Sequence, residues 1–281
     1  MKTEFFTALQ YCFSTLPVEK VDFFPIEHEP GARFFMVLSA FKTRIQVFAY
    51  PPVWIFSTTF ENLKTVVFKY DLTFYVKNAI IIAACNTVLT LLIALPAAYS
   101  FTRFRFKFKE GLFLLFIILQ LVPGISVIIG FYYIATSLGL FDTHLLLIVM
   151  YLLWNIPYAI WMLRGFFEGI PVEVEEAAQV DGYSRLGAFF RVTLPLASPG
   201  AGAVALLLFI LSWNEFTLPY FLTSFNARPL STTVAFYTTY TEIMWGEIFT
   251  LGFIATLPTI AFALLIRKYF VAALTFGAVK G

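Results

Sequence analysis

The residues best suited to a specific interaction lie in one charged run, PVEVEEAAQVDGYSRLGAFFRVTLP, at 171–195. Glu176 carries a carboxylate that an arginine can pair with in a fixed geometry. The next two residues, Ala177 and Ala178, have almost no side chain, so another surface can approach the backbone closely. This combination suits the docking of a partner protein and supplies no nucleophile, base or metal ligand set.

The local sequence of this run predicts a helix, a tight turn and a second helix. Pro171 suits the first helical turn, and the acidic residues after it favour the positive end of a helix dipole. Gly182 can adopt the left-handed conformation that ends a helix, and Ser184 can cap a second helix running towards Arg191. The alternative is a solvated helical loop that binds nothing.

A second set of chemically capable residues lies inside the apolar segments, where polarity is costly and often faces a pathway. The polar and indole side chains there are Asn86, Gln120, Trp154, Asn155, Ser212, Trp213, Asn214 and Glu215. Aromatic rings can stack on the apolar face of a solute, and amides can hydrogen-bond its polar groups. We therefore expect a substrate pathway at Trp154, Asn155, Trp213, Asn214 and Glu215. The alternative for each is a helix-to-helix hydrogen bond or an interfacial tryptophan.

The composition defines the class of protein that positions these residues. The chain has 281 residues, of which 60% are hydrophobic and 13% charged, and its mean hydropathy is +0.82. This much apolar surface requires a bilayer as solvent, so we expect an all-α polytopic membrane protein. The net charge of +2 argues against nucleic acid as a partner.

Five membrane spans are predicted, at 78–100, 111–133, 145–167, 198–222 and 247–266, the second of them able to kink at Pro123-Gly124. A further N-terminal helix ending near Phe41 would make about six spans; otherwise the chain has five and an irregular N-terminal arm. The predicted organisation is an N-terminal arm with an external loop (1–77), a membrane-spanning domain that contains the run 171–195 (78–270) and a C-terminal tail (271–281).

Basic residues predict which loops lie inside the cell. The run FTRFRFKFK at 101–109 and the pair Arg267-Lys268 flank apolar segments, as positive-inside anchors do. A nucleic-acid interpretation of the interleaved Phe and basic residues is the weaker one beside a membrane span. The loop 171–195 and the tail are therefore expected in the cytoplasm, and loops 43–77 and 223–246 outside, in a multi-pass protein of the cell membrane.

Several kinds of chemistry lack the residues they need. The cysteines Cys12 and Cys85 and the histidines His28 and His144 are too few for a disulfide framework, a metal site or a catalytic centre. No glycine-rich phosphate loop ending in Lys-Ser or Lys-Thr occurs, so the chain is not expected to be an ATPase or any other enzyme.

The spacing of Glu176-Ala177-Ala178, then Gly182, then Val192-Thr193-Leu194-Pro195 resembles the EAA loop of permeases of ABC importers. The segments at 41–43, 213–216, 228–230 and 268–281 are similar to the carbohydrate-uptake subfamily, in particular to the second permease subunits of maltose-type and glycerol-phosphate-type systems. The region before Phe41 departs from that family, which has an apolar first span there.

The resemblance implies a function and a set of partners. It implies a permease subunit of an ATP-driven, binding-protein-dependent importer of a sugar or oligosaccharide, with an ATPase-coupling loop at Glu176, Ala177, Ala178, Gly182, Leu194 and Pro195. The implied partners are a second permease subunit, giving a heterodimer, two cytoplasmic ATPases that bind ATP and magnesium, and an extracytoplasmic solute-binding protein. This chain would bind no cofactor. An ion-coupled secondary transporter and a non-transporting structural membrane subunit are the alternatives.

Overall fold

The structure is a computed structural model that describes residues 29–239 and 242–278. Within those residues the chain is helical apart from its loops and one isolated bridge between Thr238 and Ile243. Three helical segments cross the molecule as long apolar units, namely α5 (Leu72–Arg103), α8 (His144–Glu168) and a continuous stretch over 185–214. A fourth is α13 (Trp245–Ala278), whose apolar part ends at Leu265. The predicted all-α membrane architecture is confirmed.

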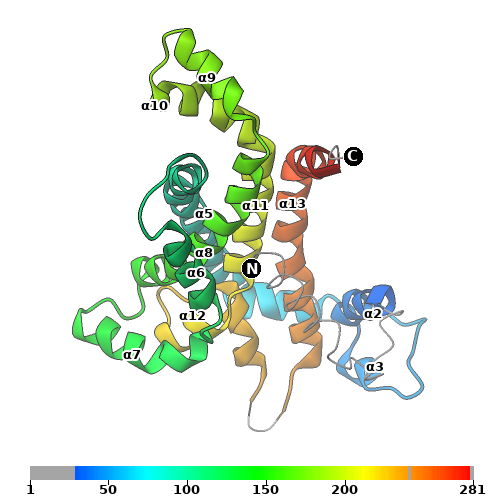
Figure 1. The fold of residues 1–281 in the computed structure, drawn as a ribbon. Helices are drawn as coiled ribbons and strands as arrows, with labels where there is room; N and C mark the ends of the chain where they lie inside the picture. Colours follow the sequence, from blue (N-terminus) through cyan, green and yellow to red (C-terminus); the bar gives the residue numbers. More distant parts are fainter. Residues whose placement is uncertain (1–28, 240–241, 279–281) are drawn as a thin grey trace, which may run out of the picture.

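The fifth apolar unit is broken. Helices α6 (Lys109–Gln120) and α7 (Gly124–Ser137) meet at an angle of 92°, and Figure 1 shows α7 running outward from the bundle. The kink predicted at Pro123-Gly124 is confirmed, and it is large enough to divide the span expected at 111–133 into two helices. Pro123 is extended at ψ 128°. Its backbone therefore redirects the chain instead of continuing the helix.

The N-terminal region contains a helix that ends where it was predicted to end. Helix α2 (Glu29–Ala40) stops one residue before Phe41. Its 12 residues are too few to cross the hydrocarbon core of a bilayer, which is about 30 Å thick. The remainder of the proposed first span lies outside the described residues. The expected loop 43–77 instead contains α3 (Arg44–Val47), α4 (Glu61–Lys64) and the π-helix η2 (Thr65–Lys69), and α5 begins already at Leu72.

Small side chains let α5, α8 and the following helix α11 (Leu194–Asn214) approach closely. Ala94, Ala98 and Ala159 are completely buried in one core cluster between these helices. At Gly200 of α11, an added Cβ would lie 2.3 Å from Cγ of Phe166 on α8. Small residues at helix contacts are the usual solution in membranes, where lipid offers no hydrophobic drive for association.

The helix predicted over 198–222 has different limits in the structure. The π-helix η3 (Phe189–Thr193) joins α10 (Arg185–Ala188) to α11, so this helical stretch begins at Arg185 and ends at Asn214. Glu215 is extended, and its carboxylate accepts from the backbone N of Leu218 at 3.0 Å, inside the short helix α12 (Thr217–Leu222). Glu215 therefore lies between two helices instead of inside one continuous helix, and its carboxylate satisfies a backbone donor of the second.

Loop 223–246 is packed against the bundle instead of being open. It contains the 3-10 helix η4 (Leu230–Tyr237), in which Thr232 and Tyr237 are almost completely buried. Asn78 of α5 donates to the backbone oxygens of Asn226 and Arg228 at 2.9 and 3.0 Å. Figure 1 shows α7 and the N-terminal part of α13 at one end of the molecule, with helices α9 and α10 and the C-terminal part of α13 at the other.

Candidate functional site

The run 171–195 folds as helix, turn and helix, as predicted. Helix α9 (Val172–Val180) follows Pro171, which is its N-cap, and Asp181 is its C-cap. Gly182 has φ +90°, and its N–H donates to the carbonyl of Gln179 at 3.1 Å, while the N–H of Tyr183 donates to that of Ala178. This is the Schellman arrangement, which needs a left-handed residue and so favours glycine. The backbone therefore turns sharply at Gly182.

Helix α10 follows directly after the turn. The Ser184 hydroxyl accepts from the N–H of Gly187 at 3.2 Å. This contact confirms the predicted cap. Beyond α10 the π-helix η3 leads directly into α11, so the second helix does not stop at Arg191. The turn is thereby joined through continuous helical backbone to a membrane-crossing element.

The predicted coupling residues divide between the two faces of α9. Glu176 and Ala177 are exposed, whereas Ala178 is only 6% exposed and lies against the protein. The expectation that Ala178 offers its backbone to an approaching surface is therefore wrong in this respect, because that side of the helix is covered. Leu194 is half-buried and Pro195 exposed at the start of α11. The free face of α9 presents Glu176 and Ala177.

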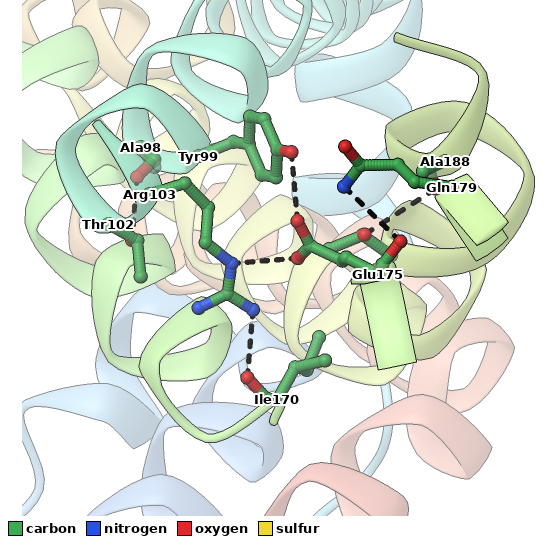
Figure 2. A network of polar contacts seen from close by, with 9 residues as sticks. Ala98, Tyr99, Thr102, Arg103, Ile170, Glu175, Gln179 and Ala188 are labelled. Carbon is green, nitrogen blue, oxygen red and sulfur yellow. Dashed lines mark hydrogen bonds and ion pairs between the residues drawn. The ribbon is translucent and has the colours of Figure 1, made fainter. Parts of the chain in front are cut away.

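The residue that anchors α9 is Glu175, which the sequence pattern alone did not single out. Figure 2 shows its carboxylate between two side chains of α5. The hydroxyl of Tyr99 donates to it at 2.9 Å, and Nε of Arg103 donates to it at 2.7 Å. Nη2 of Arg103 also donates to the carbonyl of Ile170 at 2.8 Å, just before α9 begins.

This ion pair is shielded from water. The side chains of Arg103 and Glu175 are 10% and 5% exposed. Screening by solvent is therefore weak. Charge-assisted hydrogen bonds of this kind fix both the relative orientation and the separation of the two side chains. The network ties α9 to the end of α5, and α9 cannot rotate or shift without moving that span or breaking the pair.

A second site lies where the two broken helices meet the bundle. An open cavity of about 590 Å³ is bordered by the α6–α7 bend, by α8 and by the α11–α12 break. Three of the predicted pathway residues, Trp154, Asn155 and Glu215, line it, together with Gln120 and Ser212. Within residues 34–239 and 242–265, no cluster of His, Cys, Asp or Glu is suited to a metal ion.

Asn155 and Ser212 also join three helices beside this cavity. The Asn155 amide donates to Oδ1 of Asn86 at 2.5 Å and to Oγ of Ser212 at 3.1 Å, and Ser212 donates to the same oxygen of Asn86. Asn86 is fully buried. Asn86 therefore forms hydrogen bonds between helices, which was the alternative to a role in the pathway. Asn155 and Ser212 form such hydrogen bonds and also line the cavity.

The structure places the remaining pathway candidates elsewhere. Trp213 is 3% exposed, and its Nε1 donates to the carbonyl of Ala255 on α13 at 3.1 Å. Its ring stacks on Phe209 with centroids 5.9 Å apart. Asn214 donates to the carbonyl of Ile210 in its own helix. Neither Trp213 nor Asn214 lines the cavity, and the side-chain N–H groups of both donate to backbone carbonyls elsewhere.

Known proteins resemble this chain over most of its length. The profile of the family described as "Binding-protein-dependent transport system inner membrane component" matches residues 87–275. The trehalose/maltose transport system permease protein MalG of Thermococcus litoralis is 35% identical, covering 82% of this chain and 84% of that protein. The diacetylchitobiose uptake system permease protein DasC of Streptomyces coelicolor is 32% identical, covering 88% and 91%.

A solved structure shares the fold. The match is a chain of a bacterial ABC transporter involved in the import of the acidic polysaccharide alginate, with a TM-score of 0.68 at 20% identity. The match covers 85% of this chain and 90% of the other. At this level of identity the likeness concerns the arrangement of helices alone.

Proposed function

This chain belongs to the family of inner membrane components of binding-protein-dependent transport systems, as a multi-pass permease subunit, and we propose that its system imports a sugar or an oligosaccharide. The relatives that support this solute class are named for trehalose, maltose and diacetylchitobiose. All are permeases, which also favours a transport subunit over an ion-coupled transporter or a purely structural one.

The energy for import comes, in this proposal, from a separate ATPase that acts on α9. The sequence contains no phosphate-binding loop ending in Lys-Ser or Lys-Thr, so ATP and magnesium are assigned to that partner and this chain holds no cofactor. Two ATPase subunits would dock on the EAA loops of two permeases. The end of the molecule that carries α9 and the C-terminal part of α13 would then face the cytoplasm.

The observation that carries the coupling proposal is the division of α9 into a fixed and a free face. Glu175 holds the helix to α5 through a buried ion pair, while Glu176, one residue on, is exposed. A partner that bound the free face would therefore move α5 directly. ATP can shift the equilibrium between two transporter states only if the ATPase contacts α9 differently in each.

The other partners follow from the same architecture. A second permease subunit would complete the pathway as a heterodimer, and an extracytoplasmic solute-binding protein would dock at the opposite end, on the packed loop 223–246 and the segment 43–71. Because α5 begins at Leu72, the N-terminal arm predicted at 1–77 ends at residue 71 in this assignment, followed by the permease domain to residue 270 and a cytoplasmic tail at 271–281.

Reconstitution of the complete transporter in proteoliposomes tests the proposal. Uptake of radiolabelled maltose and trehalose should require ATP together with the binding protein, and should persist when proton and sodium gradients are collapsed. Uptake driven by an ion gradient without ATP would favour a secondary transporter. Absence of sugar uptake under every condition would contradict the proposal that the solute is a sugar.

A further inference from the structure

We propose that the cavity between the α6–α7 bend and the α11–α12 break is a binding site for a sugar ring, with Tyr151 as a residue that determines which hydroxyl pattern is accepted. The inference rests on the proposed function for the solute class. The cavity measures about 590 Å³. Small-molecule sites in proteins typically occupy about 300–1000 Å³, so the cavity has a suitable size.

Tyr151 supplies the observation that points to a ligand. Its side chain is 3% exposed and lines the cavity. Its hydroxyl is buried and has no hydrogen-bond partner among the residues that the structure describes. An unpaired buried hydroxyl is costly, and native proteins rarely leave one without a partner, water or ligand. A ligand hydroxyl that binds in the cavity would satisfy it.

The other polar atoms around the cavity are mainly free acceptors. Both hydrogens of the Asn155 amide are used, on Asn86 and Ser212, and the Gln120 amide donates to the carbonyl of Trp154 at 2.6 Å. The side-chain oxygens of Asn155 and Gln120 accept from no described residue. One oxygen of Glu215 accepts from Leu218, which leaves the second oxygen without a described donor. Such a lining suits a ligand with many hydroxyl donors.

An aromatic wall completes the site. Trp154 lines the cavity and packs against Phe131 in a T-shaped arrangement, with ring centroids 6.0 Å apart. Its indole also lies 4.0 Å from the position of a Cβ on Gly124, so the bend between α6 and α7 packs against it. Tyr158 adds a second ring to the lining. Aromatic faces beside hydroxyl acceptors match the two kinds of surface that a sugar ring presents.

The test uses the complete transporter in proteoliposomes, with Tyr151→Phe, which removes only the hydroxyl. We expect the KM for uptake of the transported disaccharide to rise about three- to tenfold, the usual effect of one lost hydrogen bond. Trp154→Ala should raise it at least as much. Tyr133→Phe, on the exposed side of α7, is the matched control and should leave the KM unchanged.

Monodeoxy derivatives of the same disaccharide identify the interaction. For the derivative that lacks the hydroxyl met by Tyr151, wild type and Tyr151→Phe should have equal KM values, because the contact is absent in both. Thermal stability should be unchanged or slightly higher in Tyr151→Phe, since no protein partner is lost. Unchanged KM values for Tyr151→Phe and Trp154→Ala, with intact ATP-driven uptake, would overturn the site and leave the proposed function standing. Absence of uptake by the wild type would overturn both.

Discussion

Arg103, in the last turn of α5, donates from Nε to the carboxylate of Glu175 on α9 across 2.7 Å. These side chains are 72 positions apart in the chain and almost fully buried. The pair joins a membrane-crossing helix to the short helix that carries the exposed Glu176. In the proposed importer, this contact is how movement of the ATPase reaches the span.

Breaking this pair should destabilise the protein and uncouple it. Arg103→Ala leaves a buried carboxylate without its charge partner, which typically costs about 3–5 kcal/mol. We expect a lower melting temperature of the purified complex and loss of binding-protein-stimulated ATP hydrolysis. Arg164→Ala is the control, because its pair with Glu168 is more exposed; loss of such a pair should cost less than about 1 kcal/mol. If the loss of stability in the double variant Arg103→Ala/Glu175→Ala equals the sum of the losses in the two single variants, the residues do not interact.

The exposed and buried alanines of α9 should respond differently to enlargement. Ala177→Trp changes only the free face, so we expect normal stability. Stimulated ATP hydrolysis should fall at least about tenfold, equivalent to about 1.4 kcal/mol. Ala178→Leu overfills a covered position and should lower the melting temperature itself. ATP hydrolysis by Ala177→Trp at the wild-type rate would argue against docking on this face.

Much of this site could be predicted from local chemistry. Pro171, Gly182 and Ser184 fix the helix, turn and cap through their own backbone and side-chain preferences, so the helix–turn–helix needed no tertiary information. The choice between Glu175 and Glu176 did need it. Neighbouring residues on a helix point about 100° apart. A short helix with acids on several sides therefore does not indicate which one faces Arg103.

The two helix breaks show the same limit. Pro123-Gly124 marked the position of the bend, but its angle of 92° depends on the packing of α7 against α12 and α8. The sequence around Glu215 is typical of a helix, and only the contact with the N–H of Leu218 shows that this carboxylate satisfies a backbone donor of α12. The cavity between the breaks, and Tyr151 within it, could therefore not be foreseen.

Asp142 should make stability depend on pH in the acid range. Burial alone would raise the pKa of Asp142, but backbone N–H donors of Phe225, Ala227, Asn226 and Ser224 together hold its pKa below the ordinary value. A carboxyl with a lowered pKa stabilises the fold above its unfolded pKa of about 3.9, and this contribution is lost as the pH falls through the folded pKa. The melting temperature of the wild type should therefore fall below about pH 4, where this stabilisation is lost.

The variant Asp142→Asn isolates this effect. Asparagine tolerates the positive φ of 60° at this position but lacks the charge. We therefore expect a loss of about 1–2 kcal/mol at pH 7 and a flatter acid profile. Asp71→Asn is a matched control, because Asp71 also has a positive φ, of 46°, but caps no helix with its side chain. Equal pH profiles for wild type and Asp142→Asn would contradict the assignment.

Close packing of α8 and α11 should make Gly200 intolerant of a side chain. An added Cβ would lie 2.3 Å from Cγ of Phe166. Gly200→Ala should therefore cost about 1–3 kcal/mol, measured as a lower melting temperature. Gly165→Ala, where a Cβ meets nothing within 4 Å, should be neutral. The additional change Phe166→Ala should recover part of the loss; no recovery would mean that the clash is not the cause.

Cross-linking tests the central claim, that a partner ATPase acts on the free face of α9. In a background of Cys12→Ser and Cys85→Ser, Ala177→Cys places one exposed thiol on α9, and Ser137→Cys places one on α7 at the opposite end of the molecule. A benzophenone-maleimide attached to the introduced thiol inserts into a C–H bond of a neighbouring chain on illumination. In the assembled, ATP-hydrolysing complex it should join Ala177→Cys to the ATPase subunit and leave Ser137→Cys unlinked to it. An Ala177→Cys complex that hydrolyses ATP under binding-protein control, yet never cross-links to the ATPase, would contradict the account.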